Sequence, residues 1–356
     1  MTSELKVPLS NPAPDCERFI KAVTTNYQPD RPPLIEYILD RAVLEPVLRL
    51  MGREWVKPAA DRDSQRAYWD NFAAFWYRMG YDIVRLEISM PFPRPERQGG
   101  IRGRAYMETG AGPVSNWEQF ERYPWPDPEA VDFFCYEHIT AHLPEGMGLI
   151  ANHAGGIFEI LSVLMGYETL CLALYDQPEL VRAVVERVGG LMERFYRRII
   201  QLPRLVAVFP GDDMGFRSGT LISPAALREL TLPWHKRFAE MTHEAGLPYF
   251  LHSCGNLAEI MPDLIDEVKI DAKHSYEDAI MPAAEAKRLW GGRIGILGGV
   301  DLDKLTRLPP DELRKYVRGV IDACAPGGRF AAGSGNSIPD YIPPENYLTM
   351  IDEALR

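Results

Sequence analysis

The chain has 356 residues, of which 46% are hydrophobic and 25% are charged, proportions that are ordinary for a globular protein. A formal net charge of -11 argues against nucleic acid or an anionic membrane as a partner, because both attract a basic face. No apolar run reaches the length of a membrane span, and the N-terminus lacks the basic start and apolar core of a signal peptide. Because the five cysteines are scattered and odd in number, we expect a cytoplasmic protein with reduced thiols rather than a disulfide framework.

Residues 1–30 precede the first expected strand and are predicted to form a helical N-terminal extension. Short apolar runs then recur along the chain with helical segments between them, a pattern that favours parallel βα units. Near-continuous hydrophobicity is typical of strands that are covered on both faces. Eight runs are predicted as strands: 33–38, 81–88, 147–152, 205–213, 248–254, 270–276, 293–301 and 329–335.

The segments between these strands carry helix signals. Residues 176–200 form one predicted helix, and residues 223–246 form another, in which Pro233 predicts a kink or a division. A last, proline-led helix is predicted over residues 343–355. The stretch 89–146 is long and rich in Pro, Arg and aromatic residues, so we expect it to be an insertion that folds over one end.

Eight strands with helical connections predict an α/β protein, a (β/α)₈ barrel of the TIM type with an insertion after strand 2. Repeats, low-complexity tracts and linkers are absent from the sequence, which indicates a single domain over residues 1–356. An open doubly wound sheet is the competing architecture, because the same pattern fits it. No GxGxxG follows the first strand and no GxxxxGK[ST] occurs, so nucleotide binding through those loops has no support.

In a (β/α)₈ barrel the active site gathers at the carboxyl ends of the strands. Polar side chains occur at each of these predicted ends. They are Glu36, Glu87, His153, Asp212 with Asp213, His252 with Cys254, His274 with Glu277, Asp301, and Ser334 with Asn336. Because solvated loops also collect polar residues, this distribution alone does not separate a site from a polar rim.

The stretch 249-YFLHSCGN-256 ends a predicted strand with an imidazole and a thiol two residues apart. Residues i and i+2 of a strand point to the same face, so His252 and Cys254 should project together. An imidazole nitrogen and a thiolate sulfur make half of a tetrahedral zinc site, which needs a third protein ligand and an open position for catalysis. The alternative is a buried cysteine beside a hydrogen-bonded histidine, the commoner case for an isolated His-x-Cys.

Other strand ends leave two or three interpretations open. The pair Asp212-Asp213 is either a substrate-positioning or metal-binding pair, or a turn and helix-entry pair. His153 either donates to an anionic group of a substrate or bonds a loop carbonyl. His274 either completes a metal site, acts as a general base or is an ordinary buried histidine.

Four segments resemble the uroporphyrinogen decarboxylase superfamily. They are 211–237 (beginning GDDMGFRSGT), 250–272 (beginning FLHSCGN), 297–305 (LGGVDLDKL) and 333–354 (beginning GSGNSIPDYI). This superfamily also contains zinc-dependent methyltransferases that serve corrinoid proteins. The resemblance covers the chain from about residue 140 to the end and implies a (β/α)₈ barrel, in agreement with the strand count.

The resemblance is closer to the methyltransferase branch than to the true decarboxylases. The latter share an N-terminal RQAGRY-type motif that grips tetrapyrrole carboxylates, whereas residues 30–45 here read DRPPLIEYILDRAVLE. The His-x-Cys of His252 and Cys254 matches the methyltransferase zinc motif. Those enzymes typically add a second cysteine near the last strand, where 330-FAAGSGNSIPD-340 has none. The resemblance therefore implies two zinc ligands, with the third coming from His274, Glu277 or an aspartate, or else a site without metal.

We therefore expect a zinc-dependent methyltransferase that moves a methyl group between a small methylated substrate (O-, N- or S-methyl) or a thiol and the cobalamin of a corrinoid protein. His252 and Cys254 are the expected ligands, Asp213 and His274 are candidates for a third ligand or an acid, and Asn336 is expected to position substrate. A histidine or carboxylate in place of a second thiolate makes the metal a stronger Lewis acid, which favours the demethylating direction.

Two alternatives remain, and a homodimer is as compatible with the sequence as a monomer. The first alternative is a metal-independent decarboxylase or other lyase of the uroporphyrinogen decarboxylase type, with Asp213 and His153 in the catalytic roles. The second is a protein that binds a corrinoid or tetrapyrrole without turning it over. Zinc content discriminates the methyltransferase from both.

Overall fold

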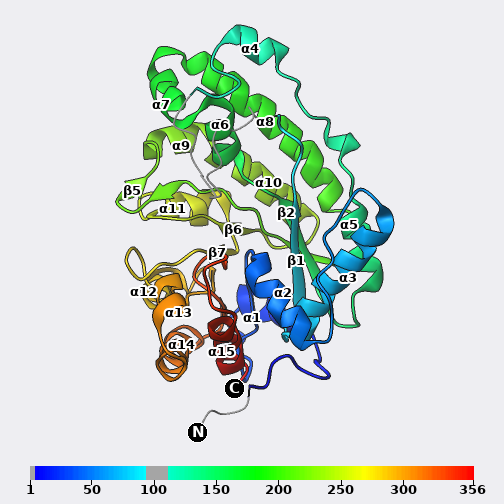
Figure 1. Cartoon of the computed structure of the whole chain (residues 1–356). Coiled ribbons are helices and arrows are strands. Elements are labelled where there is room, and N and C mark those ends of the chain that lie inside the picture. Colours follow the sequence, from blue (N-terminus) through cyan, green and yellow to red (C-terminus); the bar gives the residue numbers. More distant parts are fainter. Residues whose placement is uncertain (1–4, 94–110) are drawn as a thin grey trace.

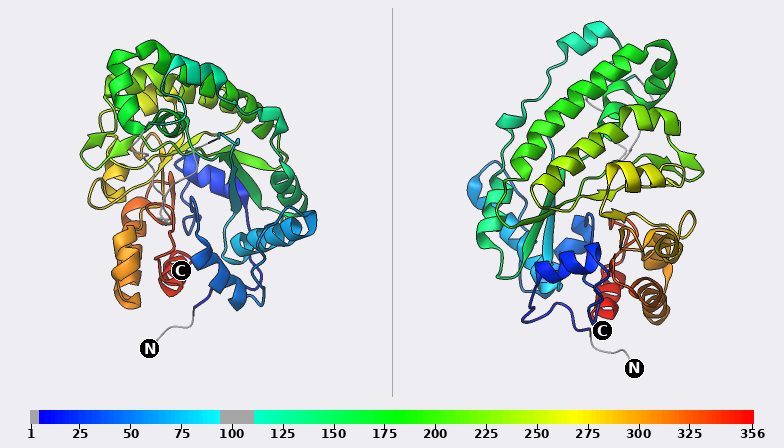
Figure 2. Two further views of the ribbon diagram at one scale, coloured as in Figure 1. Left: turned by 45° about the horizontal axis from the view of Figure 1, so that its top comes forward. Right: turned by 180° about the vertical axis from the view of Figure 1, so that it is seen from behind.

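The computed structural model describes residues 5–93 and 111–356. Helices lie on the outside and parallel strands toward the middle (Figures 1 and 2). One parallel sheet has the order β1 (Ile83–Ile88), β2 (Gly148–His153), β3 (Leu205–Val208). The other has the order β6 (Phe250–His252), β7 (Ala272–His274), β8 (Gly295–Leu297), β9 (Phe330–Ala331). A short antiparallel hairpin, β4 (Gly215–Phe216) with β5 (Gly219–Thr220), was not predicted.

Isolated parallel bridges join these sheets into one series that follows the chain. Val208 pairs with Tyr249, and Gly211 pairs with His252, which places β3 beside β6. On the far side of β9, Leu34 of the first predicted strand pairs with Ala332. All eight predicted strand positions therefore contribute to the series, although residues 33–38 form isolated bridges instead of a regular strand.

The closed (β/α)₈ barrel predicted from the sequence is not formed by backbone hydrogen bonds. Within residues 5–93 and 111–356, β1 pairs only with β2, and no bridge joins β1 to the 33–39 segment. Pro32 and Pro33 lack an N–H and so restrict pairing at the start of that segment. The Arg85 side chain crosses this seam, because its Nη1 donates to the carbonyl oxygen of Tyr37 at 2.7 Å. The chain is thus an α/β protein with parallel sheets and an open seam.

A helix follows each of β1, β2, β6, β7, β8 and β9, as expected for βα units, and fifteen α-helices are found in the described residues. They are α1 (Cys16–Thr24), α2 (Arg41–Leu50), α3 (Arg62–Arg78), α4 (Trp117–Arg122), α5 (Phe134–His142), α6 (Ile157–Met165), α7 (Tyr167–Asp176), α8 (Pro178–Ile199), α9 (Pro224–Leu230), α10 (Leu232–Glu244), α11 (Met261–Asp263), α12 (Ala283–Trp290), α13 (Leu302–Arg307), α14 (Pro310–Cys324) and α15 (Pro344–Ala354). A 3₁₀-helix, η1 (Pro128–Ala130), and a π-helical turn, η2 (Leu264–Val268), complete the set.

The predicted helices are largely confirmed. The prediction over 176–200 corresponds to α8, and the one over 343–355 to α15. The segment 223–246 is divided at Thr231 into α9 and α10, so Pro233 lies in the first turn of α10, where a missing N–H costs no hydrogen bond. Of the predicted insertion, residues 94–110 lie outside the described residues, and the remainder contains α4, η1 and α5.

Aromatic rings fill the interior beneath the carboxyl ends of the strands. Phe209 packs edge-on against Tyr37 with ring centroids 5.0 Å apart, and against His274 at 6.0 Å. The Arg85 guanidinium carbon lies 3.6 Å from the centroid of the Tyr37 ring. These edge-on and cation–π contacts pack the interior directly below the residues at the strand ends.

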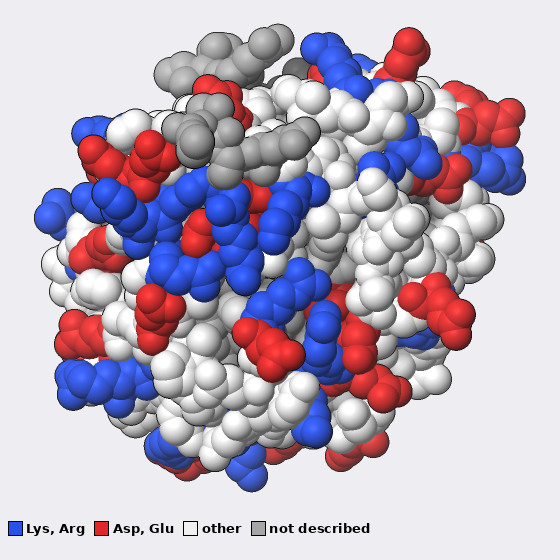
Figure 3. Space-filling model, turned by 90° about the horizontal axis from the view of Figure 1, so that it is seen from below, with Lys and Arg blue, Asp and Glu red and all other residues white. Residues whose placement is uncertain are grey.

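The surface mixes both signs of charge in spite of the net charge. On the face in Figure 3, Lys and Arg side chains gather in one area, with Asp and Glu side chains beside them.

Ion pairs join the last two helices. Arg314 of α14 pairs with Asp352 of α15 at 2.6 Å, and Arg318 pairs with Glu353 at 2.9 Å. No single helix in the described ranges is both long and apolar enough to cross a membrane, and only α6 and α7 taken together, bent by 92°, meet that length and composition.

Candidate metal centre

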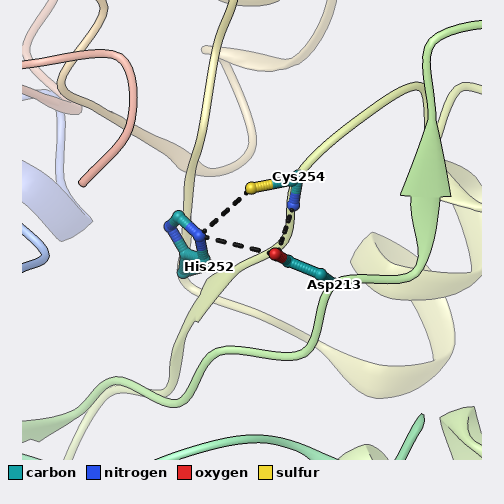
Figure 4. Close-up of side chains that lie close together, drawn as sticks. All are labelled: Asp213, His252 and Cys254. Atoms are coloured by element: carbon teal, nitrogen blue, oxygen red, sulfur yellow. Dashed lines mark hydrogen bonds and ion pairs between the residues drawn. The ribbon is translucent and has the colours of Figure 1, made fainter. Parts of the chain in front are cut away.

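Three side chains with metal-binding atoms converge where β6 ends, namely Asp213, His252 and Cys254 (Figure 4). Their ligand atoms all lie within 4.8 Å of one another. His252 Nε2 is 3.4 Å from Cys254 Sγ and 3.5 Å from Asp213 Oδ1. Zinc bonds to N, O and S at the tetrahedral angle separate ligand atoms by about 3.3–3.6 Å. The two separations from His252 Nε2 therefore fit a shared zinc ion.

Backbone pairing brings the three residues together. His252 and Cys254 project toward the same point, as predicted, although β6 ends at His252 and Cys254 lies two residues beyond the strand. His252 N donates to Pro210 O, and Asp212 N donates to His252 O, each at 2.9 Å, so the chain after β3 runs beside β6. Cys254 N then donates to Asp213 Oδ1 at 2.8 Å, which fixes the carboxylate.

Burial sets the protonation states of these three groups. It lowers the pKa of His252 well below its usual value, with further lowering by His274 and Lys273, so the imidazole is neutral. Burial and the nearby Asp213 raise the pKa of the Cys254 thiol well above its usual value. Burial also raises the pKa of Asp213, against the hydrogen bond from Cys254. A cation bound between these groups would displace the proton of the Cys254 thiol and stabilise the ionised carboxylate of Asp213.

The sulfur of Cys254 has two hydrogen-bond donors beside it. Asn336 Nδ2 lies 3.2 Å from Sγ and Ser275 Oγ lies 3.6 Å from it. Asn336 Oδ1 accepts from Ser337 N at 2.7 Å, which fixes which end of the amide faces the sulfur. The structure thus places the predicted site residue Asn336 against a candidate ligand, where it stabilises the thiolate form.

His274 lies behind His252, with neither nitrogen directed at the shared point. Its Nδ1 is 2.7 Å from Nδ1 of His252, and its Nε2 is 3.0 Å from the backbone oxygen of Ser334. Burial lowers the pKa of His274 to about 3, so this ring is also neutral. In the part of the chain that the structure describes, the converging donors do not include His274 or Glu277, the other expected sources of a third ligand besides an aspartate.

His153, a predicted catalytic residue, has backbone partners at both ring nitrogens. Nε2 accepts from Met90 N at 2.9 Å, and Nδ1 bonds the carbonyl oxygen of Gly155 at 3.0 Å. Burial lowers the pKa of His153 to about 4. These contacts match the loop-bonding interpretation of this residue, and its catalytic role stays a prediction.

The adjacent Asp212 has a different set of partners. Its carboxylate accepts from the N–H groups of Phe158 and Glu159 at 3.1 and 3.0 Å, which caps the start of α6. It also bonds His235 Nε2 at 2.8 Å. The two interpretations of the Asp-Asp pair therefore apply to one residue each: Asp212 binds a helix end and Asp213 joins the donor cluster.

Two neighbours of the centre were not predicted. The Tyr37 ring stacks on His252 with centroids 4.0 Å apart and planes 6° apart. Lys273 is buried, and its Nζ donates to the carbonyl oxygens of Ser253, His274 and Ser275 at 3.2, 3.1 and 2.9 Å. A lysine inside the predicted strand 270–276 was the available signal for Lys273. The stacking of Tyr37 depends on contacts between distant segments.

Comparisons with known proteins identify a family and a fold. The family model for uroporphyrinogen decarboxylase (URO-D) matches residues 106–356. A methyltransferase from Methanosarcina mazei superposes with a TM-score of 0.67 at 16% identity, covering 95% of this chain and 97% of that one. A Listeria monocytogenes protein assigned as a vitamin-B12-independent methionine synthase gives 0.51 at 12% identity, covering 92% and 96%. No curated protein matches the sequence.

Proposed function

The chain belongs to the uroporphyrinogen decarboxylase family, as its four sequence segments predicted, and within that family we propose that it is a zinc-dependent methyltransferase. It transfers a methyl group between a small methylated substrate (O-, N- or S-methyl) or a thiol and the cobalamin of a corrinoid protein. The observation that carries the proposal is the convergence of Asp213, His252 and Cys254 on one point. The fold shared with a methyltransferase supports it.

The donor set has the chemistry of a catalytic zinc site. One nitrogen, one sulfur and one carboxylate oxygen are borderline-soft and hard donors that zinc accepts together, and three protein ligands leave a fourth position for substrate. His252 Nε2 lies 3.5 Å from the carboxylate oxygen of Asp213 and 3.4 Å from the sulfur of Cys254, separations that a zinc ion bound to all three would give. The residues present therefore fit zinc.

Zinc bound at this point supplies a Lewis acid, which lowers the pKa of a thiol substrate or polarises the heteroatom that carries the methyl group. The protein contributes the orientation and charge of the donors. Asn336 and Ser275 donate hydrogen bonds to the Cys254 sulfur and so reduce the negative charge that it passes on. Asp213, a carboxylate in place of the second thiolate, acts in the same direction and favours demethylation of the substrate.

The proposal includes the working arrangement of the protein. Residues 1–356 act as one domain in the cytoplasm, as a monomer or homodimer, and the corrinoid protein docks where the strand ends open. His274 and Asn336 support the ligands, so the expectation that Asn336 also positions substrate becomes part of the proposal.

Zinc content tests the proposal directly. The purified wild type, Cys254→Ala, Asp213→Ala and Cys324→Ala are analysed by elemental mass spectrometry after growth with added zinc. Cys324 is a fully buried cysteine of α14 and serves as the matched control. We expect about one zinc ion per chain in the wild type and Cys324→Ala, and about a tenth or less in the other two.

Methyl transfer from methylcobalamin to a panel of thiols, and from methylated substrates to cob(I)alamin, is then measured from the corrinoid absorption spectrum. A zinc-free wild type overturns the metalloenzyme and leaves the metal-independent lyase with Asp213 and His153, or the non-catalytic binding protein. Zinc that persists in Cys254→Ala contradicts the proposed donor set.

A further inference from the structure

His274 lies between two groups that decide which of its nitrogens carries hydrogen. It is the register partner of His252 across β7 and β6, and both rings are buried. Its Nε2 is 3.0 Å from the carbonyl oxygen of Ser334, and its Nδ1 is 2.7 Å from Nδ1 of His252. A carbonyl oxygen only accepts, so Nε2 of His274 carries the hydrogen and Nδ1 of the neutral ring keeps a lone pair.

The same logic then fixes the tautomer of His252. Because Nδ1 of His274 has only a lone pair to offer, Nδ1 of His252 must donate the hydrogen in the 2.7 Å contact. The lone pair of His252 therefore lies on Nε2, the atom that faces Cys254 Sγ and Asp213 Oδ1. Only an unprotonated ring nitrogen binds a metal, so His252 is held in the binding form.

The backbone carbonyl of Ser334, where this series of hydrogen bonds begins, is itself held in place. Ser334 N donates to Glu36 Oε1 at 3.0 Å, and Ser334 Oγ contacts both Glu36 Oε2 and the backbone oxygen of Asn336. A hydroxyl has one hydrogen, so both Oγ contacts contain a hydrogen only when Glu36 is protonated and donates to Oγ. Both residues are fully buried, which leaves no water to replace these partners.

The plane of the His252 ring is fixed from the same segment. Tyr37 follows Glu36 in the chain, and its ring stacks on His252 with planes only 6° apart. Glu36 therefore holds Ser334 at one end of the series of hydrogen bonds. Tyr37 holds the ring of His252 at the other end. Rotation of His252 would break the stack and the bond to His274 together.

We propose that His274 is a positioning residue, anchored by Glu36 through Ser334, that fixes His252 in the tautomer which presents Nε2 to the metal. For the identity of the metal this inference rests on the proposed function. It assigns His274 a place beside the ligand rather than among the ligands, which separates the alternatives that its sequence position left open.

The tautomers are measured in the metal-free, full-length protein by long-range ¹H–¹⁵N correlation with ¹⁵N-labelled histidine. We expect the hydrogen of His252 on Nδ1 and that of His274 on Nε2, with the two rings assigned by comparison with His274→Gln. A hydrogen on Nε2 of His252 overturns the proposal. Since this experiment needs no zinc, it decides the inference even when the wild type contains none, in which case only the proposed function fails.

Two variants at one position then separate positioning from ligation. His274→Gln keeps an acceptor for His252 and a donor for Ser334, whereas His274→Phe keeps the volume of a ring and loses both. We expect zinc affinity, measured by competition with a chromophoric chelator, to fall about 10–100-fold in the Phe variant and less than about threefold in the Gln variant.

Two outcomes contradict the positioning role. One is wild-type zinc affinity in a His274→Phe protein that unfolds at the wild-type temperature. The other is an equal loss of affinity in both variants together with the loss of one imidazole from the Co²⁺ coordination shell by X-ray absorption, which makes His274 a ligand. The tautomer measurement on the wild type decides the question where the Phe variant does not fold.

Discussion

The adjacent residues Asp212 and Asp213 have different partners, and only Asp213 belongs to the candidate metal centre. Asp212 is fully buried and satisfies two N–H groups at the start of α6 together with His235. Asp213 accepts from Cys254 N and faces His252. Because consecutive side chains leave an extended backbone in opposite directions, one residue stabilises a helix and the next serves the donor cluster.

Glu36 gives the protein a dependence of stability on pH that is opposite to that of most carboxylates. Burial raises its pKa from 4.5 to about 8. Between these values the folded chain keeps a proton that the unfolded chain releases, so the contribution of Glu36 is complete below the unfolded pKa and is lost as pH rises toward 8. Glu36→Gln cannot ionise, yet it keeps a donor and an acceptor for Ser334.

The expected result is a difference in free energy of unfolding, Glu36→Gln minus wild type, that grows by up to about 4 kcal/mol from pH 5 to pH 8. It is measured by urea denaturation at four pH values. Glu121→Gln, at an exposed position of α4, is the control and should show a flat difference. A flat difference for Glu36→Gln as well would mean that Glu36 is ionised in the folded protein at neutral pH.

Among the elements, the open seam between β1 and the 33–39 segment is bridged by a side chain. Arg85 is buried, donates to Tyr37 O at 2.7 Å and to Asn152 Oδ1 at 3.1 Å, and pairs with Glu87. Arg85→Met removes these bonds and leaves the carboxylate of Glu87 without its ion-pair partner, although Asn152 Nδ2 still donates to it at 3.1 Å. We expect a loss of about 2–4 kcal/mol in the free energy of unfolding.

A double-mutant cycle identifies the cause of that loss. Glu87→Gln removes the stranded charge, so Arg85→Met/Glu87→Gln should be more stable than Arg85→Met alone when both are unfolded with urea. Equal stability of the two variants would show that the seam depends on the bond to Tyr37 and not on the ion pair.

Two consecutive glycines of α8 should respond in opposite ways to alanine. A Cβ at Gly189 would lie 2.1 Å from Trp234 of α10, whereas a Cβ at Gly190 meets nothing within 4 Å. Gly190→Ala should therefore stabilise the helix by about 0.5–1 kcal/mol. Gly189→Ala should destabilise the protein by about 1–3 kcal/mol, because α8 and α10 must separate. Thermal unfolding checks both, and a shift of the same sign in both would contradict this packing.

Sequence patterns predicted where the strands and helices lie, but they did not predict most of the contacts between these elements. Apolar runs and turn residues are local, so the eight strand positions and the helices α8, α10 and α15 were predictable. The 33–39 segment forms only isolated bridges, to Ala332 and Ile338 beyond β9, and the local apolar pattern of 33–38 carried no sign of this irregular pairing. The His252–Cys254 pair followed from strand alternation, but the approach of Asp213 depends on the pairing of Gly211 with His252 across two strands.

For the molecule as a whole, the packed core extends beyond the region that the family model matches. The match begins at residue 106, whereas β1 pairs with β2 along Ile83–Ile88 and Leu34 pairs beside β9. Lys6 N also donates to Asp352 Oδ1 of α15 at 2.7 Å. The N-terminal residues therefore belong to the same core as the matched region.

A chain reduced to residues 106–356 should not fold as a unit, because it exposes the edge of β2 and of β9. We expect no cooperative thermal transition by circular dichroism and strong binding of a hydrophobic dye, in contrast to the full chain. A sharp transition with native near-ultraviolet ellipticity in this fragment would show that the N-terminal residues are a separable addition.

The hydrogen bonds between residues 210–212 and His252 have a consequence for the order of folding and metal binding. These hydrogen bonds join protein atoms, and they hold Asp213 beside His252. For the proposed zinc centre we therefore expect folding to precede metal binding, unlike in zinc fingers, where metal binding and folding are coupled. If chelation removes a metal ion from this centre, we expect the fold to remain intact and the centre to accept other divalent ions afterwards.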